Sequence, residues 1–305
     1  MKSRFDKLVL EAEEGIAFEV SEETKGKLII RAMNIVTTNV CSENYSNPPI
    51  PEGYMHVCGE WNNGFVIEKC HDGSQFVWIP VGILDSNGTL DGKNFSEKFG
   101  RRNYRIDDVS DSEFNENIDD ELLKQAESVK KYGGFYISRY NISKGIDDEK
   151  PHAVKGVMPW VNINFNDAKK VASEIEDNEA AKVKSHLTFG AEYDSVLEWF
   201  IKSDAKTLDE IAWNSSQWGN YRNTKDSPRT VVETGSRKEW STNNIYDFAG
   251  NVNEWTQEKD KDSYCCVRGG SCENFGNNFP VVHRSYVGSY LKSHIVGFRA
   301  TLCIA

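Results

Sequence analysis

The sequence predicts a mixed protein of short strands, a few helices and many loops. Short strand-like runs, rich in tryptophan and glycine, dominate from about residue 50 onward. Three amphipathic stretches between residues 122 and 200 have the spacing of helices. Beyond residue 205 little further helix is readable, and short strands and polar loops run to the end.

Composition limits the classes of protein to consider. The 305 residues suit one large domain, or one domain with a small appendage, and 38% hydrophobic with 27% charged residues suits a soluble globular protein. No apolar run approaches the ~18 residues that span a membrane, and the amino terminus lacks the apolar core of a secretory signal. We therefore expect a protein made in a cytoplasm.

The charge and the cysteines exclude further classes. A net charge of −11 without a basic cluster argues against nucleic-acid binding. Seven cysteines at irregular spacing, with no CxxC pair, predict mostly reduced thiols and no structural zinc site.

The first 50 residues are expected to form a small β-rich segment of unclear role. Residues 16–20 and 27–31 have the composition of short strands. Pro48, Pro49 and Pro51 then predict a boundary near residue 50, which leaves 51–305 as the main domain.

The main domain opens with a predicted hairpin. Residues 64–68 and 75–82 are strand-like, and Asp72-Gly73 lies in the turn between them. Residues 106–121 then carry eight acids and no base, which we interpret as a solvated loop rather than a cation site.

Three helices are predicted from apolar positions at helical spacing. For the second we expect Asn166 as the N-cap. The apolar positions are Leu122, Leu123, Ala126 and Val129; Ala168, Val171, Ala172 and Ile175; and Tyr193, Val196, Leu197 and Phe200.

Six ordered segments carry a family resemblance. They are GFYISRY (134–140), PWVNINFNDA (159–168), LTFGAEY (187–193), NIYDFAGNVNEW (244–255), VRGGS (267–271) and GFRA (297–300). Together they resemble the formylglycine-generating-enzyme (sulfatase-modifying factor) family, with looser similarity back to about residue 52. The resemblance implies an irregular α+β fold related to C-type lectins. The same fold includes bacterial and phage proteins that bind varied ligands, among them variable proteins of diversity-generating retroelements, so the site residues must decide the function.

The oxidase chemistry of that family is not expected here. The resemblance implies a copper(I) site with two cysteines after the RGGS segment, yet Asn274 stands at the first position and Cys272 is the only nearby thiol. The string HRSY at 283–286 is flanked by Val282 and Val287 instead of the family's cysteines. Arg284 lies 13 residues before Gly297, a spacing that fits a later arginine of the family, so we interpret the string as a coincidence. Of Cys265 and Cys266 we expect one buried and one exposed thiol. We predict no copper, zinc or haem, with a divergent oxidase as the alternative.

The resemblance does imply a structural Ca²⁺ site. Its ligands would be side-chain oxygens of Asp247 and Glu254 and backbone carbonyls of Gly250 and Val252. Hard oxygen donors crowded in a short loop suit Ca²⁺. The alternative is that both acids cap local backbone amides.

We expect the binding face between RGGS and GFRA, because the resemblance places this segment on the exposed side of the fold. Tyr and Asn give adaptable hydrogen bonds and aromatic contact. The candidate ligand-binding residues are Glu273, Asn274, Phe275, Asn277, Asn278, Phe279, His283, Tyr286, Tyr290, Lys292 and His294.

The expected partner is a protein or carbohydrate on another cell surface, in the setting of a phage tail, a cell-surface adhesin or a retroelement-diversified protein. Two other interpretations remain open at this point. The segment could be an ordinary irregular loop, and the chain could be a structural assembly protein that docks through residues 1–50. The sequence leaves the oligomeric state open. Most of the eight tryptophans are expected in the core.

Overall fold

The computed structural model describes residues 16–23, 27–34, 47–81, 115–116, 120–145, 149–178, 182–259 and 264–305. The chain separates into two compact units, Met1–Cys41 and Ser42–Ala305. In the first, β1 (Ile16–Glu23) and β2 (Lys27–Asn34) pair as an antiparallel hairpin. The two strands predicted there are confirmed.

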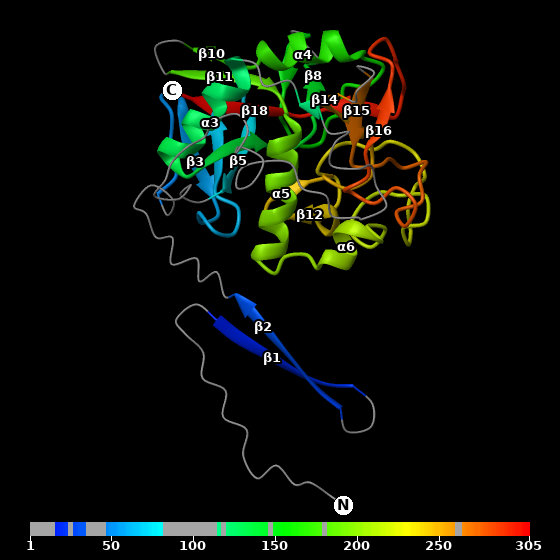
Figure 1. Cartoon of the computed structure of the whole chain (residues 1–305). Helices are drawn as coiled ribbons and strands as arrows, with labels where there is room; N and C mark the ends of the chain where they lie inside the picture. The colour runs from blue at the N-terminus through cyan, green and yellow to red at the C-terminus, as the bar shows by residue number, and fades with distance from the viewer. Residues whose placement is uncertain are drawn as a thin grey trace, which may run out of the picture. The chain divides into compact units, whose positions relative to one another are not determined.

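A seven-stranded sheet is the centre of the second unit (Figure 1). Its strand order is β10-β11-β18-β7-β5-β4-β3, so the last strand along the chain lies inside the sheet, between β11 and β7. The predicted hairpin is confirmed as β4 and β5, with Gly73 in the turn at φ 74°. The strands are β3 (Tyr54–Cys58), β4 (Val66–Lys69), β5 (Gln75–Pro80), β7 (Gly134–Ser138), β10 (Asp177–Asn178), β11 (Val183–Leu187) and β18 (Ala300–Ile304).

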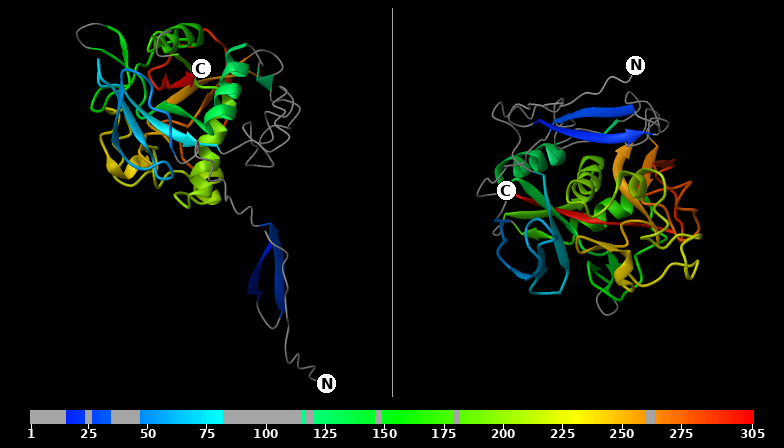
Figure 2. Two further views of the ribbon diagram at one scale, coloured as in Figure 1. Left: turned by 90° about the vertical axis from the view of Figure 1, so that its left-hand side faces the viewer. Right: turned by 90° about the horizontal axis from the view of Figure 1, so that it is seen from below.

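Helices cover both faces of this sheet (Figures 1 and 2). Helices α3 (Asp120–Tyr132) and α5 (Gly190–Lys202) pack with Val77 and Ile79 of β5 in one cluster of buried side chains. Helix α4 (Phe165–Ser173) packs with Phe76 and Trp78, the alternate residues of β5, in the other. Because successive side chains of a strand point to opposite faces, β5 joins two cores.

The three predicted helices are confirmed, with corrections in detail. Helix α4 begins at Phe165, so its N-cap is Asn164, whose Oδ1 accepts a hydrogen bond from Asp167 N at 2.9 Å; Asn166 lies inside the first turn. Ile175 is buried but lies beyond the end of the helix. Leu123 is 39% exposed, because it lies outside the buried face of the helix, which is formed by Leu122, Ala126 and Val129.

A second sheet of five strands contains parts of three of the six family segments, those at 244–255, 267–271 and 297–300. β14 pairs antiparallel with β15 and with β6, and parallel with β17. β15 also pairs with β16, which carries the middle of the expected binding segment. The strands are β6 (Asn115–Glu116), β14 (Asn253–Lys259), β15 (Cys265–Arg268), β16 (Ser285–Val287) and β17 (Val296–Phe298).

Short elements and loops complete the unit. The pairs β8 (Ser143–Lys144) with β9 (Pro151–His152) and β12 (Ser241–Thr242) with β13 (Ile245–Tyr246) form two-stranded sheets. The only further helical pieces in the described part are α6 (Leu208–Ala212) and a 3-10 turn, Lys238–Trp240. Most of the predicted acidic loop at 106–121 lies outside the described residues.

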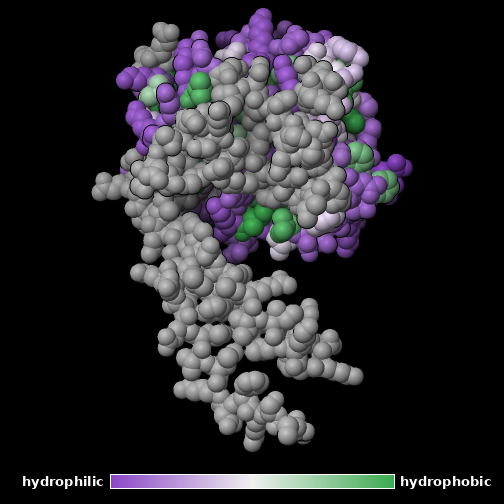
Figure 3. Space-filling view, in the orientation of Figure 1, coloured by the Kyte–Doolittle hydropathy of each residue, from purple (hydrophilic) through white to green (hydrophobic). Residues whose placement is uncertain are grey.

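On the face shown in Figure 3, hydrophilic residues predominate among the coloured atoms, and hydrophobic ones form small separate groups. No helix in the described ranges is long and apolar enough to cross a membrane. Tryptophans are mostly core residues, as predicted, with Trp213 the main exception at 46% exposed.

Candidate ligand-binding surface and metal site

The predicted binding segment, residues 272–296, runs from the end of β15 to the start of β17 and contributes β16 to the same five-stranded sheet. Its most exposed large side chain is Tyr290, at 84%, and Lys292 and His294 follow with exposed side chains. Phe275 is 43% exposed near the other end of the segment. Seven of the eleven predicted residues are exposed: Glu273, Phe275, Asn277, Asn278, Tyr290, Lys292 and His294.

The other four predicted residues are partly buried and have structural contacts. Asn274 Oδ1 accepts hydrogen bonds from Ser271 N and Ser271 Oγ, at 3.0 and 2.9 Å. The rings of Phe279 and His283 lie edge to face, 4.8 Å apart. Tyr286 pairs with Cys266 across β15 and β16. Asn274, at the position of the family's first copper cysteine, therefore holds a turn in this chain.

Hydrogen bonds to the rest of the domain fix the backbone of the segment. Ser215 N donates to Gly276 O at 3.1 Å, and Gly276 N donates to Asn223 Oδ1 at 2.9 Å. At the other end, Phe165 N donates to Ser289 O at 3.1 Å. A polar hollow of about 990 Å³ lies beside the first end, where Asn223 is one of the lining residues. The segment therefore presents its outward side chains from a braced backbone.

Four buried charged residues form a quartet: Asp194, Glu258, Arg268 and Arg284. Arg284 belongs to the binding segment, so the quartet attaches this segment to the core of the domain. Arg268 Nη1 and Nη2 lie 2.6 and 2.9 Å from Glu258 Oε1 and Asp194 Oδ1. Arg284 Nε and Nη2 lie 2.7 and 2.6 Å from the second oxygens of the same two carboxylates. All four side chains are at most 3% exposed, so the two charges of each sign compensate each other in the core.

Sequence reasoning missed this quartet. Arg284 belongs to the HRSY string, and its burial against two acids shows that it has a defined structural role in this chain. The sequence does not show that Asp194 and Glu258 are buried in ion pairs, because a single acid within a helix or strand resembles any surface acid until its partners are known.

The predicted metal ligands Asp247 and Glu254 are both buried. Asp247 Oδ2 accepts hydrogen bonds from Gly235 N and Thr234 Oγ1, at 2.7 and 3.1 Å, while its Oδ1 has no partner. Glu254 Oε1 accepts from Asn141 Nδ2, at 2.7 Å, and its Oε2 has no partner. Buried carboxylate oxygens without donors are costly, and a bound cation would relieve that cost.

Burial and a neighbouring arginine have opposite effects on the pKa values of these two acids. Burial is the main cause that raises the pKa of Asp247, and burial raises the pKa of Glu254 to about 7. The Arg299 guanidinium, whose Nε lies 2.7 Å from Glu254 Oε1, opposes both shifts. Within the described ranges no three His, Cys, Asp or Glu residues are gathered to hold a metal. A cation here would therefore also need carbonyl ligands, as the resemblance assigns to Gly250 and Val252.

The backbone around Asp247 has unusual conformations. Asp247, Gly250 and Asn251 have φ values of 54°, 73° and 62°. A Cβ at Gly250 would come within 2.6 Å of Asn220 O, so glycine is required there on both steric and conformational grounds.

The cysteines correct one expectation. Cys265 and Cys266 are both buried, as is Cys272. The expected alternation fails because both faces of β15 are covered, and all four of its residues are buried. Burial raises the pKa of the Cys272 thiol to about 11, so it is protonated at neutral pH.

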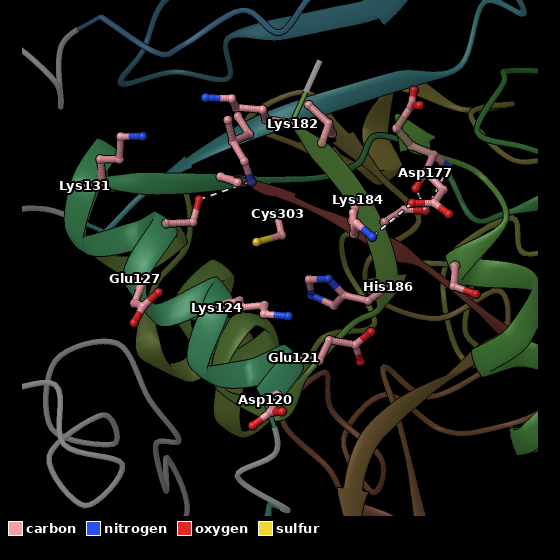
Figure 4. Close-up of a pocket in the computed structure, with 17 residues that line it drawn as sticks. Asp120, Glu121, Lys124, Glu127, Lys131, Asp177, Lys182, Lys184, His186 and Cys303 are labelled. Atoms are coloured by element: carbon pink, nitrogen blue, oxygen red, sulfur yellow. Dashed lines mark hydrogen bonds and ion pairs between the residues drawn. The ribbon is translucent and has the colours of Figure 1, made fainter. Parts of the chain in front are cut away.

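A second hollow of about 860 Å³ lies between α3 and the strands β11 and β18 (Figure 4). Its lining includes Lys124 and Lys131 of α3, Lys184 and His186 of β11, and Cys303 of β18. Nothing in the sequence patterns indicated it, since its residues come from four separated segments of the chain.

The two sheets, three main helices and long irregular connections define an α+β protein of the C-type-lectin-like type. Residues 64–303 match the FGE-sulfatase family model, described as a sulfatase-modifying factor enzyme 1-like domain. The chain therefore belongs to this family, as its six motifs indicated.

Several solved structures are similar to the chain. Treponema denticola variable protein 1 is 17% identical, with 57% of this chain and 85% of that one covered and a TM-score of 0.40. PvdO from Pseudomonas aeruginosa is 14% identical, with 79% and 99% covered and a TM-score of 0.49. CarF is 15% identical, with 56% and 87% covered and a TM-score of 0.39. No curated protein sequence matches the chain.

Proposed function

We propose that this chain is a non-catalytic, ligand-binding member of the FGE-sulfatase family. In this proposal the outward side of residues 272–296 recognises a protein or carbohydrate on another cell surface, in the setting of a phage tail or an adhesin. The observation that supports it most is the difference between the fixed backbone of this segment and its exposed side chains. Its backbone is held by Asn223, Ser215 and the buried charge quartet, whereas Tyr290 is 84% exposed. Preorganised polar and aromatic side chains bind at low entropic cost.

We further propose that Ca²⁺ holds the loop behind this surface. The unpartnered oxygens of Asp247 and Glu254, with the carbonyls of Gly250 and Val252, suit the ion in chemical type. The cation would neutralise two buried acids and stabilise the left-handed turn between them. It would have a structural role.

Arrays of glycans and bacterial surface components test the recognition surface. Three proteins are compared: wild type, a triple variant (Tyr290→Ser, Lys292→Ser, His294→Ser), and a control, Leu208→Ser, at an exposed position on α6. Loss of an aromatic anchor and its neighbours should weaken binding at least about tenfold, while the control binds like wild type.

Two results would contradict the proposal. Ligand binding that survives in the folded triple variant would remove the surface assignment. Copper(I)-dependent oxidation of a cysteine peptide by the wild type would instead favour the oxidase.

A further inference from the structure

The hollow between α3, β11 and β18 is independent of the proposed recognition surface, and its chemistry indicates a ligand of its own. At about 860 Å³ it lies within the ~300–1,000 Å³ typical of small-molecule sites. Lys184 and His186 project to the same side of β11, because they are two residues apart on one strand. Cys303 pairs with Lys184 across the two strands. This side of the sheet faces α3, which provides the opposite wall.

Lys124 indicates what would bind there. Its ammonium extends from α3 toward the middle of the hollow and toward His186 (Figure 4). Among the described residues Lys124 has no hydrogen bond or ion pair, whereas Lys184 Nζ lies 3.3 Å from Asp177 Oδ1. Lys124 is an exposed residue whose ammonium reaches into the hollow, and an ammonium there gains from an anionic partner that supplies charge-assisted hydrogen bonds.

His186 provides a second polar group beside it. The imidazole is 2% exposed, and its Nε2 lies 2.9 Å from Glu192 Oε1. Glu192 also accepts hydrogen bonds from Gln125 Nε2 at 2.7 Å and Phe189 N at 2.8 Å, so this acid is fixed behind the ring. Burial lowers the pKa of His186, but the charge and hydrogen bond of Glu192 outweigh it and raise the pKa overall.

The remaining interior is close to neutral. Burial, with the nearby charges of Glu192 and Glu121, raises the pKa of the Cys303 thiol to about 12. Glu121 is already engaged, because it lies 3.6 Å from Lys169 Nζ and accepts a hydrogen bond from Gln257 Nε2. Asp120 and Glu127 point away from Cys303 in Figure 4. Of the other lining acids, Asp177 is paired with Lys184 and Glu176 with Lys69, and the uncharged part of the lining includes Ser128, Val183, Cys303 and Ile304.

We propose that this hollow binds a small molecule with a single anionic head group, a carboxylate or sulfonate, held by Lys124 and His186, whose uncharged body lies against Cys303 and α3.

Two fluorescent probes of nearly the same aromatic body test this proposal. Anilinonaphthalene sulfonate carries one anionic group, and N-phenyl-1-naphthylamine carries none. The proteins are the full-length wild type, Lys124→Met, which keeps the aliphatic stem, and Lys130→Met, a charge-matched control on the same helix outside the lining. The fourth protein is Cys303→Phe, whose larger side chain fills the hollow. Melting curves establish that each variant is folded.

The expected result is one saturable sulfonate site that Lys124→Met weakens at least about tenfold. The uncharged probe should bind both lysine variants equally, and Cys303→Phe should abolish both probes. Equal binding of the sulfonate to Lys124→Met and Lys130→Met would overturn the anion assignment. Undiminished binding of both probes to Cys303→Phe, or no saturable binding to the wild type, would overturn the site itself.

Discussion

Arg284 and Asp194, 90 residues apart in the chain, meet at 2.6 Å in the core of the domain. Asp194 lies on α5, and Arg284 lies directly before β16 in the expected binding segment. The pair therefore fixes the surface segment to a helix of the central core. Together with Glu258 and Arg268 it leaves each carboxylate oxygen of the quartet with an arginine donor.

Arg284→Met should be strongly destabilising. The variant leaves two buried acids with only one arginine between them, and the loss of one partner of a buried pair costs about 3–5 kcal/mol. Urea unfolding followed by fluorescence measures the change in the free energy of unfolding. Lys292→Met, an exposed lysine of the same segment, serves as the control and should differ little from wild type. A small effect of Arg284→Met would mean that the ion pairs of the quartet are not formed in solution.

Gly190→Ala should lower stability, although alanine normally favours a helix by ~1 kcal/mol over glycine. A Cβ at Gly190 would overlap Cγ and Cδ of Glu258, a member of the quartet. Displacing Glu258 would disturb its ion pairs with Arg268 and Arg284. The substitution should therefore destabilise the protein, although alanine is the better helix former. Thermal unfolding of the single variant measures this. A higher melting temperature for Gly190→Ala would show that Glu258 can move without loss.

Chelation of Ca²⁺ should lower the melting temperature of the wild type, because the cation would neutralise the buried oxygens of Asp247 and Glu254. Asp247→Asn should make the melting temperature insensitive to chelator. Asp204→Asn is a matched control, since Asp204 also has a positive φ, 56°, but is exposed. Melting curves with and without chelator give the answer. Equal curves for the wild type would count against the ion.

Stability should depend on pH through His186. Its pKa is raised in the folded state by Glu192, so its contribution is fully present below the unfolded value of about 6.5 and is lost as pH rises through the folded value. The difference in the free energy of unfolding between wild type and His186→Asn should therefore shrink from pH 6 to pH 9. Urea titrations at several pH values measure it. Glu192→Gln should weaken the same dependence, and a constant difference across the range would contradict the assignment.

Glycine at position 250 should be irreplaceable by larger residues. Gly250→Ala combines a left-handed φ of 73° with a Cβ only 2.6 Å from Asn220 O. The expected loss exceeds the ~1 kcal/mol of conformational strain alone. Gly156→Ala, at φ 77° with open space around the Cβ, should show only that strain. Urea unfolding of the two variants compares them, and equal losses would indicate that the loop adjusts around position 250.

Much of the fold could be predicted because its signals are local. The spacing of Tyr193, Val196, Leu197 and Phe200 predicts α5 without knowledge of any partner, and Asp72-Gly73 predicts the β4–β5 turn. Motifs such as GFYISRY and GFRA then identified the family. The N-cap of α4 was wrong by two residues, since Asn164 and Asn166 are equally good caps in sequence.

The candidate sites were harder to predict because their partners are distant in the chain. The spacing of Arg284 to GFRA fits a family arginine, but its partners Asp194 and Glu258 could be identified only from the structure. Asn274 was expected to contact ligand, but its side chain is engaged with Ser271. The hollow at Lys124 and His186 depends on the packing of α3 against β11 and β18, which no local pattern specifies.

The interior position of β18 has a consequence for biosynthesis. β11 and β7 both pair with β18 and not with each other, yet residues 300–304 are translated after all the other strands. While they are still inside the ribosome, β10–β11 and β7–β5–β4–β3 are two separate groups with open edges. Unpaired edges of this kind invite aggregation. The nascent domain must therefore keep two incomplete half-sheets apart until its final strand emerges and joins them.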